Sequence, residues 1–252
     1  MTLTDADEGM IAETVTVPGQ GGDLIHAYYA RPLGPGPFPS VLLFHHRPGW
    51  DAWYRQTTRL FAAHGYLAMS PDLYCRVGHG EADDVAARAR ASGGVSDDQV
   101  VADAVGCIDY LRAQPAASGK VGLFGTCSGG RHAYLTACRL DNIDAIVDCW
   151  GGGIIAREGD LSPLTPIAPA DLTHQLAAPL LGLFGNEDHN PTRADVDSLE
   201  EILKGLGKDY EFHRYAGAGH GFFYHDRPSA YRAEAAVDGW SRVWSFLERA
   251  LS

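Results

Sequence analysis

The sequence lacks any long apolar run and is poor in basic residues. No uninterrupted hydrophobic stretch approaches the ~18 residues that a membrane-spanning helix needs. Of the 252 residues, 20 are Lys or Arg against 32 Asp or Glu, which gives a formal net charge of −12. Such an excess of negative charge is repelled by nucleic acid and by anionic membranes. We therefore expect neither as a partner, and an anionic substrate would need a local group of arginines.

Cysteine is scarce and follows no disulfide or metal-binding pattern. The five cysteines are odd in number, and no two of them have the C-x-x-C spacing. The first ten residues, MTLTDADEGM, are acidic and lack the apolar segment of a secretion signal. These features predict reduced thiols in a cytoplasmic protein, without a disulfide framework or a zinc site.

What the chain does have is an alternation of strand and helix patterns. Apolar and polar side chains alternate over 13–17 and 23–32 around a Gly-rich turn, which predicts an antiparallel hairpin. Apolar runs predict six further strands, at residues 39–46, 65–72, 120–125, 143–150, 178–185 and 209–215. Helical periodicity, with a capping box of Ser96 and Gln99 before the second segment, predicts helices at 51–64, 96–115, 129–140, 192–205 and 230–251.

This order predicts a single α/β domain over residues 1–252. Strands that alternate with helices form a mostly parallel central sheet with helices on both faces, and the two leading strands form an antiparallel N-terminal edge. Functional residues of such a sheet lie at the carboxyl ends of its strands. The two least regular stretches, 75–95 and 151–178, both leave such ends. We therefore expect them to form the walls of a pocket.

A cysteine stands between glycines directly after a predicted strand. The segment GTCSG, residues 125–129, fits the nucleophile elbow G-x-nucleophile-x-G, with Cys127 in the place that serine usually holds. The turn strains the backbone of its central residue, and side chains at the glycine positions would clash. The helix that follows directs its N-terminus at the thiol, which favours a thiolate and a developing oxyanion. The pattern predicts a nucleophilic cysteine.

Two later segments supply the partners that a thiol nucleophile needs, a base and an acid that orients it. Asp188 follows Gly185 at the end of a predicted strand, with Glu187 as the competing carboxylate. His220 lies in the small-residue loop YAGAGHGFF, the one such loop downstream that carries a histidine. The order nucleophile, acid, histidine is that of α/β-hydrolases. The sequence predicts a triad of Cys127, Asp188 and His220.

With these motifs the sequence resembles the dienelactone hydrolases, α/β-hydrolases whose elbow carries a cysteine. The resemblance begins near residue 12, covers nearly all of the chain, and rests on GYLAMSPDLYCR, KVGLFGTCSGG, GNEDHNP and GHGFF. It implies that a lactone or small carboxylic ester is cleaved through an acyl-cysteine, without a cofactor. It also implies an oxyanion hole formed by the backbone N–H groups of Ser128 and Arg47. We expect a monomer or a homodimer.

The sequence departs from this family where the thiol is tuned and the substrate is held. The family generally has a glutamate before the oxyanion loop, where it controls protonation of the thiol. His46 stands at that position here, and a protonated imidazole there would stabilise the thiolate. The family also binds a substrate carboxylate through arginines, and Tyr224 stands near the place of one of them. The candidate substrate-binding residues are Arg76, Arg88, Arg90, Trp50, Phe222 and Tyr224.

Other interpretations stay open beside the hydrolase. A zinc hydrolase would need ligands from a set without metalloprotease spacing, namely His45, His46, Asp188, His189 and His220. A ligand-binding pseudoenzyme is a second class, because hydrolase folds also serve as receptors. Ester turnover that disappears in Cys127→Ala would separate an enzyme from a receptor. Among enzymes, the alternative is a thioesterase or small-ester hydrolase with a less charged acyl group.

Overall fold

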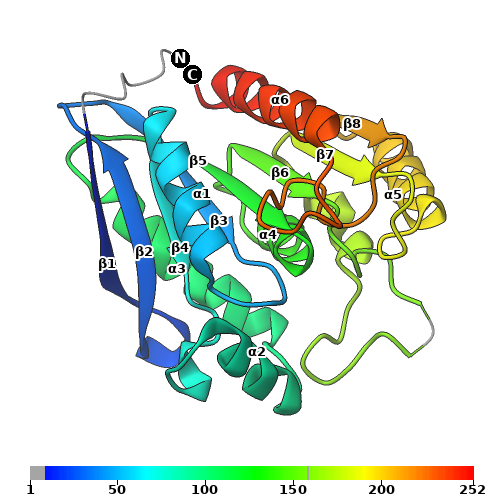
Figure 1. The fold of residues 1–252 in the computed structure, drawn as a ribbon, viewed down its shortest axis with the longest axis horizontal. Helices are drawn as coiled ribbons and strands as arrows, with labels where there is room; N and C mark the ends of the chain where they lie inside the picture. Colours follow the sequence, from blue (N-terminus) through cyan, green and yellow to red (C-terminus); the bar gives the residue numbers. More distant parts are fainter. Residues whose placement is uncertain (1–8, 158) are drawn as a thin grey trace.

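One eight-stranded sheet organises the molecule (Figure 1). The computed structural model describes residues 9–157 and 159–252. The first eight residues, which belong to the predicted domain and to the segment compared with secretion signals, lie outside the described residues. In chain order the strands are β1 (Met10–Pro18), β2 (Leu24–Pro32), β3 (Phe38–Phe44), β4 (Leu67–Pro71), β5 (Ala117–Thr126), β6 (Ala145–Cys149), β7 (Leu180–Gly185) and β8 (Tyr210–Tyr215).

The strand order across the sheet is β1-β2-β4-β3-β5-β6-β7-β8. Strands β1 and β2 pair antiparallel, and β2 pairs antiparallel with β4. All the remaining neighbours, from β4 to β8, pair parallel. The structure thus confirms a mostly parallel sheet with an antiparallel N-terminal edge. The carboxyl ends of β3, β5, β7 and β8 lie along one edge of this sheet, because these strands run in the same direction.

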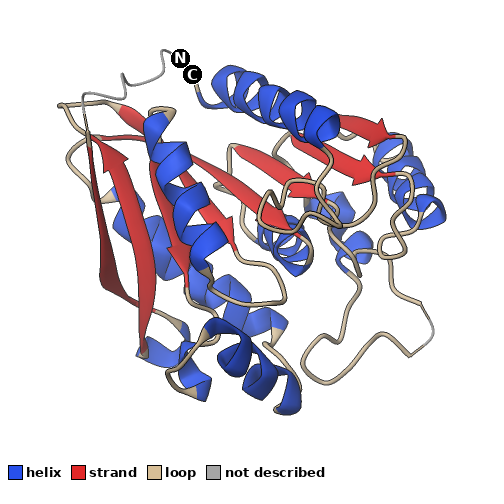
Figure 2. Cartoon of the chain, in the orientation of Figure 1, coloured by secondary structure: helices blue, strands red, loops and turns tan. Residues whose placement is uncertain are grey.

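Helices cover both faces of the sheet (Figure 2). They are α1 (Ala52–Ala63), α2 (Ala82–Ala91), α3 (Asp97–Arg112), α4 (Ser128–Arg139), α5 (Arg193–Gly205) and α6 (Ala233–Leu251), with short 3₁₀ turns η1 (Gln20–Gly22), η2 (Cys75–Val77) and η3 (Pro169–Gln175). Each helix begins within three residues of the start expected from the sequence, except α2, which was not expected.

Two hydrophobic cores lie on opposite faces of the sheet. Successive residues of β3 alternate between them: Val41 and Leu43 pack with α1 and α6, while Leu42 and Phe44 pack with α3 and α4. This alternation is the period of two that a strand imposes on its side chains. A strand covered on both faces needs apolar residues throughout, which explains the continuous apolar runs of the sequence.

Two local expectations differ from the structure. The stretch 75–95, one of the two that we expected to be least regular, holds η2 and α2, and α2 buries the side chain of Val85 and neighbouring alanines in the core. At the start of α3, Ser96 Oγ accepts a hydrogen bond from the Gln99 backbone N–H at 3.1 Å. The Gln99 side chain instead donates to the Leu73 carbonyl at 3.0 Å. A tertiary contact has thus replaced the second half of the expected capping box.

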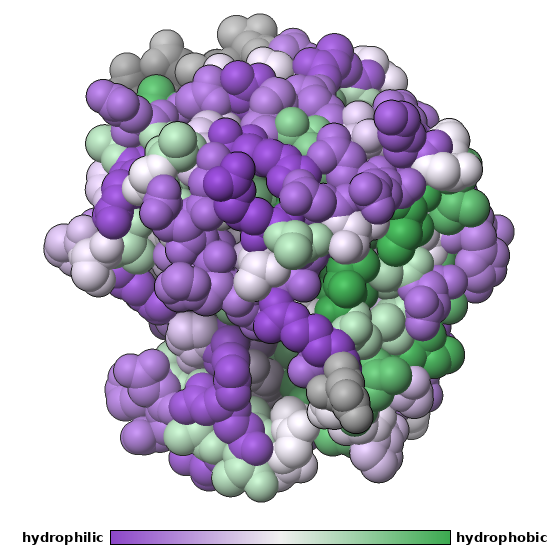
Figure 3. Space-filling model, turned by 90° about the vertical axis from the view of Figure 1, so that its right-hand side faces the viewer, coloured by the Kyte–Doolittle hydropathy of each residue, from purple (hydrophilic) through white to green (hydrophobic). Residues whose placement is uncertain are grey.

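The surface is mainly polar on the side shown in Figure 3, and its hydrophobic side chains gather in a band along the right-hand edge of that view. Across residues 9–157 and 159–252, none of the helices combines the length and the apolar character needed to cross a bilayer.

Candidate active site

Cys127 occupies the turn between β5 and α4, at the centre of the sheet edge. Its backbone has φ 57° and ψ −127°, a conformation that non-glycine residues rarely adopt. Backbone strain of this kind costs about 1–3 kcal/mol and persists where the surrounding structure holds it. The backbone N–H of Cys127 donates to the Cys149 carbonyl at 3.0 Å, which ties the turn to the end of β6. The sulfur is thereby presented at the carboxyl end of the sheet.

The glycines of the elbow allow close approach of backbone to backbone. A Cβ on Gly129 would lie 1.9 Å from the carbonyl oxygen of Phe44, the last residue of β3. A Cβ on Gly125 would lie 2.0 Å from the Gly129 carbonyl oxygen. Any side chain at these two positions would push α4 away from β5 and from the loop after β3. The side-chain clash that the sequence predicts at these glycines would therefore be with the carbonyl oxygens of Phe44 and Gly129.

His220 and Asp188 meet beside the thiol. His220 Nδ1 lies 2.8 Å from Asp188 Oδ2, and the Asp188 side chain is 3% exposed. The other Asp188 oxygen accepts the Asn190 backbone N–H at 2.9 Å. Glu187 points elsewhere, since its Oε1 accepts the Gly217 backbone N–H at 3.3 Å. Of the two carboxylates that the sequence offered, the structure places Asp188 on the imidazole.

The thiol and the imidazole shift each other's pKa in opposite directions. Burial alone would raise the pKa of Cys127, but the hydrogen bond and charge of His220, followed by the backbone N–H groups of Arg47 and Ser128, bring it below its ordinary value. Burial alone would lower the pKa of His220, but its bonds to Asp188 and then to Cys127 raise it to about 10. Because Nδ1 faces Asp188, Nε2 is the ring nitrogen left for the thiol. Both shifts favour a thiolate–imidazolium pair over two neutral groups.

The loop after β3 brings a second backbone N–H to the sulfur. The Arg47 and Ser128 N–H groups, for which the resemblance implies an oxyanion hole, both lower the pKa of the Cys127 thiol, and the Arg47 side chain is exposed. The Arg47 carbonyl accepts the Tyr74 hydroxyl at 3.3 Å. Tyr74 is the last residue of the PDLY segment, and the sequence motif did not reveal its role. Its hydrogen bond joins the loop after β4 to the loop after β3 that carries Arg47.

His46 is fully buried and bonds to a carboxylate. Its Nε2 lies 2.7 Å from Asp51 Oδ2, and Asp51 also caps α1 by accepting the Tyr54 backbone N–H. Arg227 lies 3.6 Å from the same Asp51 oxygen. His46 Nδ1 has no hydrogen-bond partner among the described residues. The histidine expected to tune the thiol is therefore one half of a buried histidine–carboxylate pair.

Two of the three candidate arginines are engaged in hydrogen bonds with other parts of the chain. Arg76 makes a two-pronged ion pair with Asp103 at 2.8 and 2.9 Å, and Asp103 is fully buried. Arg88 donates to the carbonyls of Val77 and His79 at 3.1 and 2.8 Å. For Arg76 and Arg88 the substrate contact stays a prediction, and their donors are occupied by Asp103 and by the Val77 and His79 carbonyls in this structure. Arg90 is exposed, and its charge acts on Tyr74.

The two aromatic candidates after His220 are part of the core, and their contact with a substrate stays a prediction. Phe222 is 0% exposed and packs on the Trp150 ring at 4.5 Å between centroids. Tyr224 is 3% exposed, and its hydroxyl lies 2.7 Å from Thr126 Oγ1. Tyr54 shares that oxygen at 2.7 Å. Two tyrosines from distant segments therefore support the residue before the nucleophile, a role that spacing in the sequence does not reveal.

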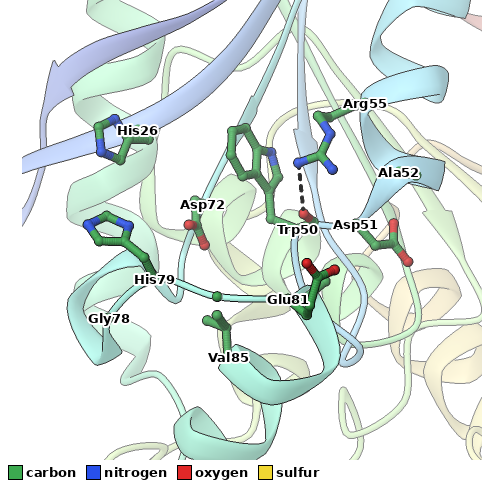
Figure 4. Close-up of a pocket in the computed structure, with 12 residues that line it drawn as sticks. His26, Trp50, Asp51, Ala52, Arg55, Asp72, Gly78, His79, Glu81 and Val85 are labelled. Atoms are coloured by element: carbon green, nitrogen blue, oxygen red, sulfur yellow. Dashed lines mark hydrogen bonds between the residues drawn. The ribbon is translucent and has the colours of Figure 1, made fainter.

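Trp50 lines a cavity of about 410 Å³ (Figure 4). Its indole stands between the side chains of Asp72 and Arg55, and Arg55 donates to the Trp50 carbonyl at 3.4 Å. The walls carry three carboxylates and one guanidinium: Asp51, Asp72, Glu81 and Arg55. Asp51 belongs both to this cavity and to the pair with His46. A cavity with these walls favours neutral or cationic groups over anionic ones.

Three of the four histidines in the alternative zinc set bond to different partners. His45 bonds to backbone groups of the loops after β3 and β4, His46 to Asp51, and His220 to Asp188. Within residues 9–157 and 159–252, the side chains of His, Cys, Asp and Glu form no cluster of three or more suited to a metal ion.

The chain is similar over nearly its whole length to one protein family and to proteins named after its activity. Residues 25–251 match the model of the dienelactone hydrolase family. A Methylorubrum extorquens protein whose name assigns it as a carboxymethylenebutenolidase is 36% identical over 254 residues, 98% of this chain and 83% of the relative. A relative of the same name from Escherichia coli K12 is 32% identical over 96% of this chain and 89% of its own length.

Solved structures agree with this similarity. A Klebsiella pneumoniae protein described as a dienelactone hydrolase superposes with a TM-score of 0.87 at 28% identity, over 96% of this chain and 99% of that one. A metagenomic dienelactone hydrolase-like phosphotriesterase, at 20% identity and a TM-score of 0.78, shares the fold over 96% of this chain and 99% of its own. This chain belongs to the dienelactone hydrolase family.

Proposed function

We propose that this protein hydrolyses a lactone or a small carboxylic ester through an acyl-enzyme on Cys127. One observation carries the proposal: His220 Nδ1 lies 2.8 Å from Asp188 Oδ2, and the same imidazole lowers the pKa of the Cys127 thiol. A nucleophile, a base and an acid that orients the base are the parts that acyl transfer requires.

In the first half of the reaction the Cys127 thiolate attacks the carbonyl carbon, and the carbonyl π electrons move to oxygen. The Arg47 and Ser128 N–H groups, which bond to the sulfur in the free enzyme, are placed to donate to that oxyanion. When the tetrahedral intermediate collapses, the C–O bond of the ester or lactone ring breaks. The leaving alkoxide takes the Nε2 proton of His220, and a thioester remains on Cys127.

In the second half, water attacks the acyl-enzyme; the alcohol of an ester has left by then, whereas the new hydroxyl of a lactone stays on the acyl group. Neutral His220 takes a proton from water as its oxygen attacks the thioester carbonyl, and the Asp188 carboxylate stabilises the imidazolium that forms. Collapse breaks the C–S bond and releases the carboxylic acid. Cys127 leaves as a thiolate beside the imidazolium, which is the resting state, and the acid gives up its own proton to solvent.

A second candidate substrate class, esters or thioesters with an uncharged acyl group, is favoured by the state of the arginines. Arg76 is paired with a buried carboxylate, and Arg88 holds two carbonyls. Arg90 is the one candidate of the three that keeps an exposed guanidinium near Tyr74. A substrate carboxylate would therefore depend on Arg90, and an uncharged acyl group would not.

The test compares matched substrates on three proteins. A lactone with a free carboxylate, its methyl ester, an aryl acetate and an acyl thioester are turned over by wild type, Cys127→Ala and Cys75→Ala. Cys127→Ala should lose at least ~10³-fold in kcat on every substrate that wild type cleaves, whereas Cys75→Ala should retain its activity.

Mass spectrometry after brief treatment with an aryl ester should find the acyl group on the peptide that contains Cys127. Activity that survives Cys127→Ala, with the adduct on another cysteine, would refute the mechanism. Substrate binding without any turnover would identify a receptor instead of an enzyme.

A further inference from the structure

We infer that the buried imidazole of His45 is a positioning residue, which holds and polarises the peptide unit between His46 and Arg47 so that its N–H faces the Cys127 sulfur. The catalytic meaning of this inference rests on the proposed function, in which that N–H belongs to the oxyanion hole. The inference itself concerns contacts that exist in the resting protein.

The hydrogen bonds of His45 define which of its nitrogens carries the proton. His45 is 1% exposed, with Nε2 3.2 Å from the Leu73 backbone nitrogen and Nδ1 2.9 Å from the His46 carbonyl oxygen. A backbone N–H can only donate, so Nε2 accepts. A carbonyl oxygen can only accept, so Nδ1 carries the proton and donates it. Both bonds are satisfied by one neutral tautomer.

The surroundings keep this ring neutral. Burial, reinforced by the nearby His46, lowers the pKa of His45 to about 4, against smaller opposing effects of the His46 carbonyl and of Asp51. The ring of Tyr74 packs edge-on against it with centroids 4.6 Å apart, and the ring of Tyr54 lies at 6.3 Å. A ring that does not titrate near neutral pH keeps Nδ1–H on the His46 carbonyl throughout the working range.

The acceptor of that bond belongs to the same peptide unit as the N–H at the thiol. A peptide bond is planar and trans, so the His46 C=O and the Arg47 N–H point in opposite directions from one rigid unit. The His46 oxygen also accepts the Gly49 N–H at 2.9 Å. Two donors on the oxygen draw electron density from the nitrogen and make its N–H a stronger donor, by roughly 10–30% per bond.

The same contacts fix the direction in which this N–H points. His45 joins the loop after β3 to the Leu73 backbone, and Tyr74, the next residue, donates its hydroxyl to the Arg47 carbonyl at 3.3 Å. The peptide units on both sides of the Arg47 Cα are therefore held from the loop after β4. An oxyanion donor is most effective if it is in place before the charge develops. These contacts hold the Arg47 N–H in place before the reaction begins.

Two substitutions separate the two bonds of His45. An asparagine amide occupies the place of Nδ1 and its N–H can reach the His46 carbonyl, whereas a glutamine amide reaches the place of Nε2 and serves Leu73. Because the Arg47 N–H also stabilises the thiolate, alkylation of Cys127 by iodoacetamide reports on this donor without any turnover. The readout is the pH midpoint of alkylation, taken from the mass of the Cys127 peptide.

We expect His45→Asn to keep the midpoint of wild type and its kcat within ~3-fold. His45→Gln should move the midpoint upward by at least about half a pH unit and lower kcat ~10-fold with KM unchanged. Equal shifts in both variants, no shift in either, or a larger shift in His45→Asn would overturn the inference.

A measurement on the wild type covers the case in which the variants fail to fold. Nitrogen NMR of ¹⁵N-histidine-labelled protein should show His45 neutral from pH 6 to 8, with the proton on Nδ1; a proton on Nε2 would overturn the inference. Neither readout needs catalysis. A protein that passes both and cleaves no ester would therefore overturn the proposed function alone.

Discussion

Asp188 and His220 face each other from the loops after two neighbouring parallel strands, with Oδ2 2.8 Å from Nδ1. Glu187 precedes Asp188 directly in the chain, yet its carboxylate turns to the Gly217 backbone N–H. Adjacent residues in a tight turn point in different directions. Only one of the two neighbouring carboxylates therefore contacts the imidazole. A substitution of Glu187 is the control for the same substitution of Asp188.

We expect Asp188→Asn to lower kcat by ~10³–10⁴-fold, while Glu187→Gln lowers it by less than ~10-fold. The amide that replaces the Asp188 carboxylate cannot stabilise the imidazolium, and it favours the wrong tautomer of His220. Steady-state kinetics on one aryl ester, with circular dichroism to establish folding, is sufficient. The opposite ranking would assign the acid to Glu187.

The thiolate–imidazolium pair predicts an unusual pH profile of alkylation. Because His220, Arg47 and Ser128 lower the pKa of Cys127, its iodoacetamide rate should stay high well below pH ~8.5, the ordinary thiol value. The rate should fall only as the pH drops through the lowered pKa, where the sulfur takes up its proton. His220→Gln should move this fall to higher pH, since the stabilising charge is lost.

Cys75 serves as an internal control in the same sample. It is half-buried, and burial together with the charge of Asp72 raises its pKa. Its peptide should therefore be alkylated slowly below pH ~9. Equal profiles for the Cys127 and Cys75 peptides would contradict the ion pair.

The fold and the centre of the site were predictable because their signals are local. A strand buried on both faces needs a continuous apolar run. A nucleophile elbow needs glycines where two backbone segments pack too closely to leave room for a Cβ. Gly129 against the Phe44 carbonyl is such a place. Consecutive residues carry these signals, so the succession of strands and helices along the chain, and the place of Cys127 after a strand, could be predicted.

The contacts that were not anticipated depend on partners distant in the chain. Arg76 is drawn to Asp103, 27 residues away, because a buried carboxylate must be paired. Tyr224 bonds to Thr126 across 98 residues, and a tyrosine in the core needs a partner for its hydroxyl. The composition of the sequence does not show which distant residue a side chain will contact. An exposed substrate-binding arginine and a buried structural one therefore read alike in the sequence.

His46 offers a test of how the thiol is tuned. Its ring lies 5.0 Å from that of Tyr224, and the Cys127 charge in turn acts on Tyr224. In His46→Glu a second carboxylate would stand beside Asp51, and its charge would disfavour a nearby thiolate. The Cys127 alkylation profile should move to higher pH. An unchanged profile would limit His46 to holding Asp51 and the start of α1.

Arg90 and Arg76 should separate substrate binding from stability. We expect Arg90→Gln to raise KM ~10-fold for a lactone with a free carboxylate and to leave KM for its methyl ester unchanged, because one charge pair is lost. Arg76→Gln should lower the melting temperature instead, since it leaves the buried Asp103 unpaired. Equal effects of Arg90→Gln on both substrates would remove Arg90 from the substrate site.

The last prediction concerns Asp148, a buried carboxyl on β6 that the proposed mechanism does not use. Oδ1 accepts the Gly151 backbone N–H at 2.8 Å, and Oδ2 has no hydrogen-bond partner among the described residues. Burial raises its pKa from 3.8 to about 7. Between these values the folded protein holds a proton that the unfolded chain has released, so the free energy of unfolding falls as the pH rises.

Asp148→Asn keeps an oxygen for Gly151 and removes the charge. Its stability relative to wild type should therefore increase from pH 4 to pH 7, by at most about 1.4 kcal/mol per pH unit, and stay constant above pH 7. Melting temperatures measured from pH 4.5 to 8.5 give this difference. Asp98→Asn is the matched control, because Asp98 is 74% exposed and its difference from wild type should stay nearly flat. A flat difference for Asp148→Asn as well would mean that Asp148 ionises normally, through water that reaches Oδ2.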